Sequence, residues 1–399
     1  MSIFSSLTNE PADPIVRTME LFQKDTNPNK IDVSIGVYKD EAGGLYCFDV
    51  VKDAKKHLFE NDPGHGYTTM AGVPAFVKSA QQVVFGDSIA QEGKLASLQA
   101  ISGSGALHMG LMLLVQAGHK DFYVGTPTWS NYIPMITHVG GNVKTYEHYN
   151  ADSRTVNFES VVGTLETAPS GSVFLFQTCC HNPTGADYSR DQWTKILDLV
   201  ENKNHIVLFD NAYQGFASGD LDEDAWAIRH AYGKGLEFVV AQSFSKNLGL
   251  YSERVGCVHA VVQNKEFVPH TQSTLVATFR HECSFAPAYG ARIAAYVIQN
   301  EDKRDHWRKE VAAVRNRLVA LRQKVLDKLT ELGTPGDWTN VVAQNGLFWF
   351  SQLSEDENER LIAKHVYSTN IGRVNIAGLN DANVDQFCKA IDEVVRNTV

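Results

Sequence analysis

Residues 237–254 read EFVVAQSFSKNLGLYSER. The stretch begins with an apolar, β-branched run, which is typical of a strand in the interior of a sheet. Directly after this run the chain presents Ser243, Ser245 and Lys246, and Arg254 follows eight positions later. Ligands of open α/β sheets bind beyond the carboxyl ends of the strands, so this group of polar and cationic side chains indicates a ligand site.

Similar apolar runs recur along the chain from about residue 97, separated by stretches with helical or loop character. They are Leu98–Ile101, Phe122–Val124, Val143–Tyr146, Val173–Phe176, Ile206–Phe209, Phe238–Ala241 and Val255–Val262. Near-continuous apolar strands that alternate with helices predict an α/β fold. We expect a large domain with a mostly parallel sheet that is covered by helices on both faces.

The alternation stops near residue 300, and apolar residues then recur every three or four positions from Trp307 to Leu332. This spacing, with charges between, predicts one long amphipathic helix. Strand-like runs at 346–353 and 372–378 predict a smaller α+β domain after it. We expect an N-terminal segment that joins the small domain (1–45), a large domain (46–300), and the connecting helix with the small C-terminal domain (301–399).

The composition argues against several classes of protein. The chain has 399 residues and a formal net charge of −10, and this acidic balance is unfavourable for binding nucleic acids or anionic membranes. No apolar run approaches the roughly 20 residues that cross a bilayer, and the N-terminus lacks the features of a secretory signal. Six cysteines without a CxxC pattern suit a reducing compartment. We expect a cytoplasmic protein that binds no nucleic acid, no membrane and no metal.

Two further segments place polar groups after an apolar strand. Residues 98–107 read LQAISGSGAL, a strand that enters a glycine-rich turn and then a helix. Such a turn exposes N–H groups that suit a phosphate, although an ordinary tight turn has the same pattern. Asp210 follows another apolar strand, and Tyr213 lies three residues further on. A buried carboxylate there needs a cationic partner, unless Asp210 only caps a helix.

Lys246 gives these segments a common chemistry. Lysine is usually a solvated surface residue, but Ser243, Ser245 and Arg254 supply hydrogen-bond donors for a dianionic phosphate. A lysine at a phosphate pocket, with Asp210 beyond the same sheet, fits pyridoxal 5'-phosphate. This cofactor requires a Schiff-base lysine, an acid at its pyridine nitrogen and a phosphate-binding cup.

The order of the motifs carries more information than any one of them. They are the glycine-rich turn SGSG at 102–105, HNPTG at 181–185, FDNAYQGF at 209–216, SFSKNLGLYSERVG at 243–256 and GRVNIAG at 372–378. Together they resemble the fold-type I pyridoxal-phosphate aminotransferases, in the aspartate and aromatic amino acid branch of class I. The resemblance covers almost the whole chain, from IGVYKDE near residue 35 onward.

The resemblance implies catalytic roles for three residues. Lys246 would form the internal Schiff base with the cofactor and then serve as base and acid in the proton transfer. Asp210 would keep the pyridine nitrogen protonated, and Tyr213 would join Asn182 in hydrogen bonding to the phenolic oxygen of the cofactor. Residues 46–300 would therefore form the cofactor-binding domain.

The resemblance also implies the remaining contacts to the cofactor. Trp129 would stack on the cofactor ring, and Tyr67 would reach the phosphate bound by a neighbouring subunit. The phosphate cup would consist of Ser102, Gly103, Ser104, Ser243, Ser245 and Arg254.

Substrate contacts are implied as well. Arg373 would bind the α-carboxylate through its planar guanidinium fork, Gly36 would let the substrate approach the main chain, and Trp129 and Asn182 would border the substrate. Arg280, ten residues before Gly290, matches an arginine that crosses a dimer interface to bind a side-chain carboxylate, although a surface salt bridge is the simpler role. Shared sites of this kind imply a homodimer.

Several positions depart from the family pattern. Tyr132 stands where the family usually has a histidine behind the pyridine-binding aspartate. Cys283 and Phe285 change the usual YSNPP to CSFAP. Gly66 replaces an asparagine, and Ser104 replaces the threonine of aspartate-selective members. These changes leave room for an aromatic substrate.

We therefore expect an aspartate aminotransferase that transfers the amino group of L-aspartate to 2-oxoglutarate, with some aromatic amino acid activity. Oxaloacetate and L-glutamate would be produced by a ping-pong mechanism. The alternative is a predominantly aromatic-amino-acid aminotransferase. A pyridoxal-phosphate-binding regulator would need a DNA-binding module, for which there is no room before residue 30. Other reactions of the cofactor, such as β-elimination, fit less well because Arg280 and Arg373 together favour a dicarboxylate.

Overall fold

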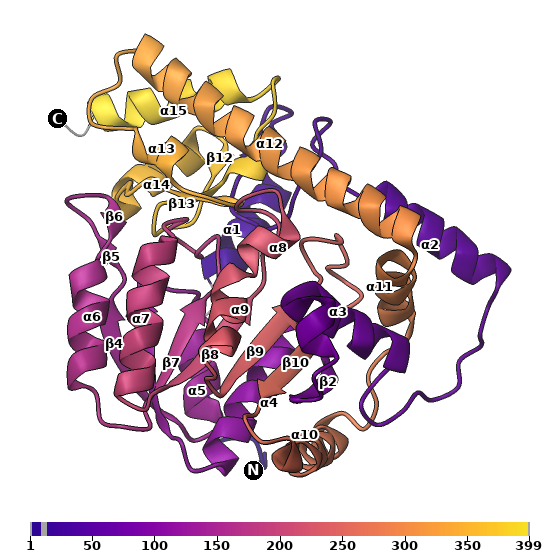
Figure 1. The fold of residues 1–399 in the computed structure, drawn as a ribbon. Helices are drawn as coiled ribbons and strands as arrows, with labels where there is room; N and C mark the ends of the chain where they lie inside the picture. The colour runs from indigo at the N-terminus through magenta and orange to yellow at the C-terminus, as the bar shows by residue number, and fades with distance from the viewer. Residues whose placement is uncertain (1, 9–13, 398–399) are drawn as a thin grey trace.

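A seven-stranded sheet lies at the centre of the computed structural model, which describes residues 2–8 and 14–397 (Figure 1). Its strand order is β2-β10-β9-β8-β7-β3-β4, and β10 runs antiparallel to both of its neighbours while the other pairs are parallel. The strands are β2 (Leu95–Ile101), β3 (Asp121–Thr126), β4 (Asn142–Glu147), β7 (Val173–Gln177), β8 (Ile206–Asn211), β9 (Phe238–Ser243) and β10 (Val255–Val261). The predicted α/β fold is therefore confirmed.

Helices cover both faces of this sheet. Alternate residues of each interior strand point to opposite sides, so every interior strand packs against helices on both faces. On one face Leu175 and Leu208 join a buried cluster with α4 (Ser102–Gln116), α5 (Tyr132–His138) and α10 (Val268–Glu282). On the other face Phe174 and Phe209 pack with α3 (Pro74–Ala90), α6 (Phe158–Thr167), α7 (Arg190–Asn202) and α9 (Trp226–Gly233). Strands buried on both faces explain the near-continuous apolar runs in the sequence.

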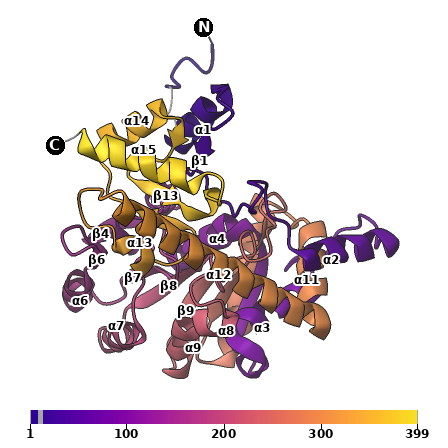
Figure 2. The ribbon, with the colours of Figure 1, turned by 90° about the horizontal axis from the view of Figure 1, so that it is seen from above.

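The predicted long helix is α12 (Glu301–Glu331), which is also confirmed. It runs along one side of the molecule, from α2 (Asp49–Glu60) and α11 (Tyr289–Gln299) to the C-terminal elements (Figures 1 and 2). Its buried stripe is formed by Trp307, Val311, Val314, Leu318, Leu321, Val325 and Leu329. No helix in the described ranges is both long and apolar enough to cross a membrane.

Segments from the two ends of the chain pair with each other. The strand β1 (Ile31–Asp32) is parallel to β12 (Val366–Tyr367), and β11 (Phe348–Phe350) is antiparallel to β13 (Arg373–Asn375). The other helices here are α1 (Pro14–Lys24), α13 (Asn340–Ala343), α14 (Glu355–Ala363), α15 (Val384–Arg396) and the short 3-10 helix Ile376–Gly378. Elsewhere lie α8 (Leu221–Asp224), β5 (Tyr149–Asn150) and β6 (Thr155–Val156). The domain boundaries at residues 45 and 300 stay a prediction.

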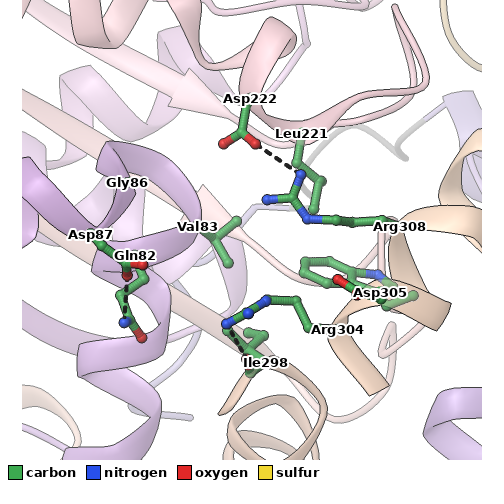
Figure 3. Close-up of a pocket in the computed structure, with 11 residues that line it drawn as sticks. Gln82, Val83, Gly86, Asp87, Leu221, Asp222, Ile298, Arg304, Asp305 and Arg308 are labelled. Atoms are coloured by element: carbon green, nitrogen blue, oxygen red, sulfur yellow. Dashed lines mark hydrogen bonds and ion pairs between the residues drawn. The ribbon is translucent and has the colours of Figure 1, made fainter. Parts of the chain in front are cut away.

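The start of α12 borders a cavity of about 310 Å³ beside α3 and α8 (Figure 3). On its wall, the guanidinium of Arg308 lies 2.8 Å from the carboxylate of Asp222. Next to them, the buried indole N–H of Trp307 donates to the main-chain oxygen of Asn247 over 2.6 Å. This bond ties α12 to the segment that carries Lys246.

Replacing Trp307 tests this link. Trp307→Phe removes the hydrogen bond and part of the buried volume, so we expect the free energy of unfolding to fall by about 1–3 kcal/mol. Urea unfolding followed by circular dichroism measures the change. Trp338→Phe is the control, because the N–H of Trp338 donates over a longer 3.4 Å. If the free energy of unfolding fell equally in both variants, the hydrogen bond of Trp307 would contribute no more to stability than that of Trp338.

Candidate active site

A cavity of about 230 Å³ opens at the carboxyl ends of the central strands. Its position follows from the sheet, because Gln177 at the end of β7 is in register with Asp210 on β8, and Ser243 ends the neighbouring β9. Of the site residues predicted from the sequence, those that line the cavity are Gly36, Ser102, Gly103, Ser104, Trp129, Asn182, Asp210, Tyr213, Ser243, Ser245, Lys246 and Arg254. Their roles in binding and catalysis remain predictions.

Asp210 is the acidic group of this cavity and is 8% exposed. Its Oδ2 atom accepts a hydrogen bond of 2.5 Å from the hydroxyl of Tyr132. Burial raises the pKa of the Asp210 carboxyl, while the hydrogen bond from Tyr132 and the charge of Lys246 lower it. A carboxylate with two such partners is able to carry its charge inside the protein.

Lys246 is the basic group of the cavity, and its Nζ lies 5.0 Å from the centre of the Tyr213 ring. Burial lowers the pKa of the Lys246 amine to about 8; the charge of Asp210 opposes this shift, and those of Arg254 and Arg373 add to it. Near neutral pH a useful fraction of the amine is therefore unprotonated and able to act as a nucleophile or a base.

The glycine-rich turn packs closely against the ends of β9 and β10. Ser102 begins α4 with a positive φ of 67°, and its main-chain N–H donates to the carbonyl of Arg254 over 2.9 Å. A Cβ atom on Gly103 would lie 2.8 Å from the Cβ of Ser243, so the close approach requires glycine. The start of α4 thus lies beside the hydroxyls of Ser243 and Ser245.

This arrangement fits the phosphate group of pyridoxal phosphate. The free N–H groups of α4, the serine hydroxyls and the Arg254 guanidinium are the donors that a dianion requires. Asp210 and Lys246 in the same cavity fit the pyridine nitrogen and the aldehyde carbon of that cofactor. The donor set in the cavity therefore agrees with the cofactor expected from the sequence.

Arg373 adjoins this cavity from β13 and is 5% exposed. It donates to Asn182 Oδ1 over 3.2 Å and to the carbonyl of Ser34 over 2.6 Å, and its guanidinium lies 4.3 Å from the centre of the Phe348 ring. Through these contacts the N-terminal segment and β13 bring a buried cation to the wall of the site.

Tyr67 and Arg280 lie apart from the residues that line the cavity. Tyr67 is 87% exposed and stacks on Phe285, with ring centres 4.7 Å apart. The guanidinium of Arg280 lies 5.7 Å from the centre of the Phe285 ring and donates a hydrogen bond to Ser284 Oγ. The two residues predicted to act across an interface thus form one exposed group around Phe285.

Four residues that line the cavity were not among the predicted site residues: Tyr132, Gln177, Ala212 and Tyr251. Gln177 exchanges hydrogen bonds with the main chain of Asn182, at 2.7 and 3.0 Å. The Tyr251 hydroxyl accepts a hydrogen bond from the N–H of Tyr38. Gln177 directly follows the predicted strand Val173–Phe176, which is a usable signal, whereas Tyr132 was noted in the sequence only as a departure from the family.

The shifted pKa of Lys246 predicts how cofactor capture depends on pH. Only the unprotonated amine attacks an aldehyde, so the rate at which cofactor-free protein attaches pyridoxal phosphate should rise with pH, with an inflection near 8. Borohydride trapping followed by mass spectrometry measures the attached fraction over time. Lys246→Ala should attach none, and an inflection near the ordinary value of 10.5 would contradict the lowered pKa.

Comparisons with known proteins agree with this geometry. The chain matches the family described as aminotransferase class I and II over residues 28–391. It is 38% identical to the cytoplasmic aspartate aminotransferase of Saccharomyces cerevisiae, with 99% of this chain and 97% of that protein covered. The solved structure of aspartate aminotransferase from the cytoplasm of S. cerevisiae is similar at a TM-score of 0.97 and 36% identity, covering 100% of this chain and 99% of that one.

Relatives with other substrates are almost as similar in structure. An aromatic-amino-acid aminotransferase from Burkholderia pseudomallei, covalently bound to pyridoxal phosphate, has a TM-score of 0.96 at 32% identity, covering 99% of this chain and 100% of that one. The broad specificity aminotransferase from Leishmania mexicana has a TM-score of 0.95 at 36% identity, with 99% and 98% covered. The fold alone therefore does not separate aspartate from aromatic substrates.

Proposed function

Because the chain belongs to the class I and II aminotransferase family, we propose that it is an aspartate aminotransferase. Its cofactor is pyridoxal 5'-phosphate, which the family uses. The amino group of L-aspartate passes to 2-oxoglutarate, and the products are oxaloacetate and L-glutamate. The reaction is ping-pong, so oxaloacetate leaves before 2-oxoglutarate binds. The yeast relative is named as cytoplasmic, which supports a cytoplasmic location.

Lys246 and Asp210 have different roles in proton transfer. Pyridoxal phosphate, when bound, supplies an electron sink for the pair that remains on the substrate Cα after its proton is removed. Lys246 would take that proton on Nζ and pass it to the aldehyde carbon of the cofactor, because a pKa of about 8 suits both steps. Asp210 holds a buried negative charge that stabilises a protonated ring nitrogen.

One observation carries the assignment to amino acid substrates. The buried guanidinium of Arg373 adjoins the cavity that contains Lys246 and Asp210, and it reaches the cavity wall through Asn182. A guanidinium fork binds a carboxylate through two parallel hydrogen bonds. Arg373 therefore holds the α-carboxylate of the substrate near Lys246.

A homodimer completes the site for a second carboxylate. Arg280 and Tyr67 are exposed and lie outside their own cavity, in a group with Phe285. In a symmetric dimer such residues serve the cavity of the other subunit. Arg280 then binds the side-chain carboxylate of aspartate or of 2-oxoglutarate, and Tyr67 binds the phosphate of the cofactor.

An aromatic-amino-acid aminotransferase is the second candidate. The observation that favours it is the stack of Tyr67 on Phe285, with the guanidinium of Arg280 over Phe285. These flat surfaces suit an aromatic side chain as well as a carboxylate.

Replacing Arg280 tests whether its guanidinium binds the side-chain carboxylate of the substrate. Arg280→Ala leaves a substrate carboxylate without its partner, so kcat/KM for aspartate should fall by roughly 100-fold or more, while the value for phenylalanine changes by less than about fivefold. Steady-state kinetics with both amino acids measure this. His281→Ala, the adjacent exposed residue on α10, is the control and should change neither value. Equal losses for the two substrates would show that Arg280 does not bind the side chain.

The same variant tests whether the sites are shared between subunits. Arg280→Ala chains mixed with Lys246→Ala chains form hybrid dimers in which one cavity has both its own Lys246 and the other chain's arginine. Random reassociation should restore about a quarter of the wild-type activity toward aspartate, because half of the dimers are hybrids with one complete site each. No restoration would contradict shared sites.

A further inference from the structure

Tyr132 is held against the active-site carboxylate by its packing. It is the first residue of α5, is 1% exposed, and belongs to the buried cluster between α5 and the sheet. The ring of Trp129 stands perpendicular to it, with centres 5.4 Å apart. A buried ring in such packing has little freedom, so its hydroxyl is fixed 2.5 Å from Asp210 Oδ2.

Because Tyr132 holds Oδ2 of Asp210, the orientation of the other oxygen, Oδ1, is fixed as well. In the described part of the chain, hydrogen bonds to the Asp210 side chain reach Oδ2 and none reaches Oδ1. The main-chain oxygen of Asp210 accepts from the N–H and the hydroxyl of Thr178, at 3.0 and 3.2 Å, which fixes the backbone as well. The carboxylate thus has one occupied oxygen and one that remains for a ligand in the cavity.

We propose that Tyr132 is a positioning residue that directs Asp210 toward the ring nitrogen of the cofactor and sets the pH below which the cofactor is released. Tyr132 acts through Asp210 and need not touch the cofactor itself. The inference rests on the cofactor and is independent of which amino acid is the substrate.

The Tyr132 hydroxyl donates to Asp210 in the same protonation state over the whole working pH range. Burial raises the pKa of the Tyr132 phenol well above its ordinary value, and the negative charge of Asp210 raises it further. The hydroxyl therefore stays a neutral donor. Such a donor stabilises the ionised carboxylate without adding a second charge that titrates. Loss of the donor therefore raises the pKa of Asp210.

Most other titratable groups around this pair have pKa values outside the range from pH 5 to 7. His148 and His181 border a small cavity with Tyr132, and burial lowers the pKa of His148 to about 4 and that of His181 well below its ordinary value. Burial raises the pKa of the Tyr213 phenol, and Lys246 titrates near 8.

Asp187 does titrate between pH 5 and 7, since burial raises its pKa to about 6, and it accepts hydrogen bonds from the main-chain N–H groups of Cys180 and His181. Asp187 is the same in every variant, so a difference in acid behaviour between Tyr132→Phe and the unmodified protein reports Asp210.

The test measures cofactor affinity as a function of pH. Cofactor-free protein is titrated with pyridoxal phosphate between pH 5 and 9, and binding is followed by quenching of tryptophan fluorescence. In Tyr132→Phe we expect the dissociation constant at pH 7 to rise about tenfold and the loss of affinity in acid to begin about one pH unit higher. Tyr146→Phe is the matched control, because it removes another buried hydroxyl of the same small cavity that does not contact Asp210.

A second variant moves the effect in the opposite direction. With 3-fluorotyrosine incorporated at position 132, the phenol is a stronger donor, so the acid inflection should shift to lower pH. Thermal unfolding of each variant verifies that the fold is kept. Equal shifts in Tyr132→Phe and Tyr146→Phe, or an acid inflection that neither change at position 132 moves, would overturn the proposal.

Discussion

A buried negative charge on Asp210 is the constraint around which the site is organised. A carboxylate that is 8% exposed is costly to ionise unless other groups compensate for the lost hydration. Here the compensation comes from Tyr132 on α5 and from Lys246 after β9. The same proximity affects the lysine, because burial lowers its pKa and Asp210 limits that shift. The acid and the base of the site thus depend on each other.

The sheet provides the geometry that this pairing needs. The parallel strands β7, β8 and β9 end side by side, so Gln177, Asp210 and Ser243 meet at one edge. The antiparallel β10 then brings Gly256 opposite Ser243 and against the turn at Ser102, where a Cβ on Gly256 would lie 2.3 Å from the Ser102 oxygen. Gly103 and Gly256 therefore allow the glycine-rich turn to approach the strand that leads to Lys246.

The sequence predicted those features that follow from local pattern. Interior strands that are buried on both faces appeared as apolar runs, and the polar residues after them could be assigned to one edge of the sheet. The edge strand β4 is largely exposed, and only Val143 and Tyr146 marked it in the sequence. No local pattern indicates the hydrogen bond between Tyr132 and Asp210, because it joins residues 78 positions apart through the packing of α5. The family resemblance placed Tyr132 behind the aspartate but did not show that its hydroxyl replaces the usual histidine. Arg322 is a second example. It lies in the middle of α12 and is 2% exposed, and it donates to the carbonyls of Val341, Gly346 and Phe348, which no periodic pattern indicates.

The central claim is that one cavity, with Lys246 as base and Asp210 as its counter-charge, transfers an amino group through bound pyridoxal phosphate. A single-turnover experiment tests it most directly. Purified protein loaded with the cofactor is mixed with L-aspartate in the absence of any oxo acid, and oxaloacetate is quantified while the absorption spectrum of the cofactor is followed. The account predicts one oxaloacetate per subunit, formed together with the spectral change and then no more. Continuous product formation without an acceptor, or a spectrum that aspartate leaves unchanged, would contradict it.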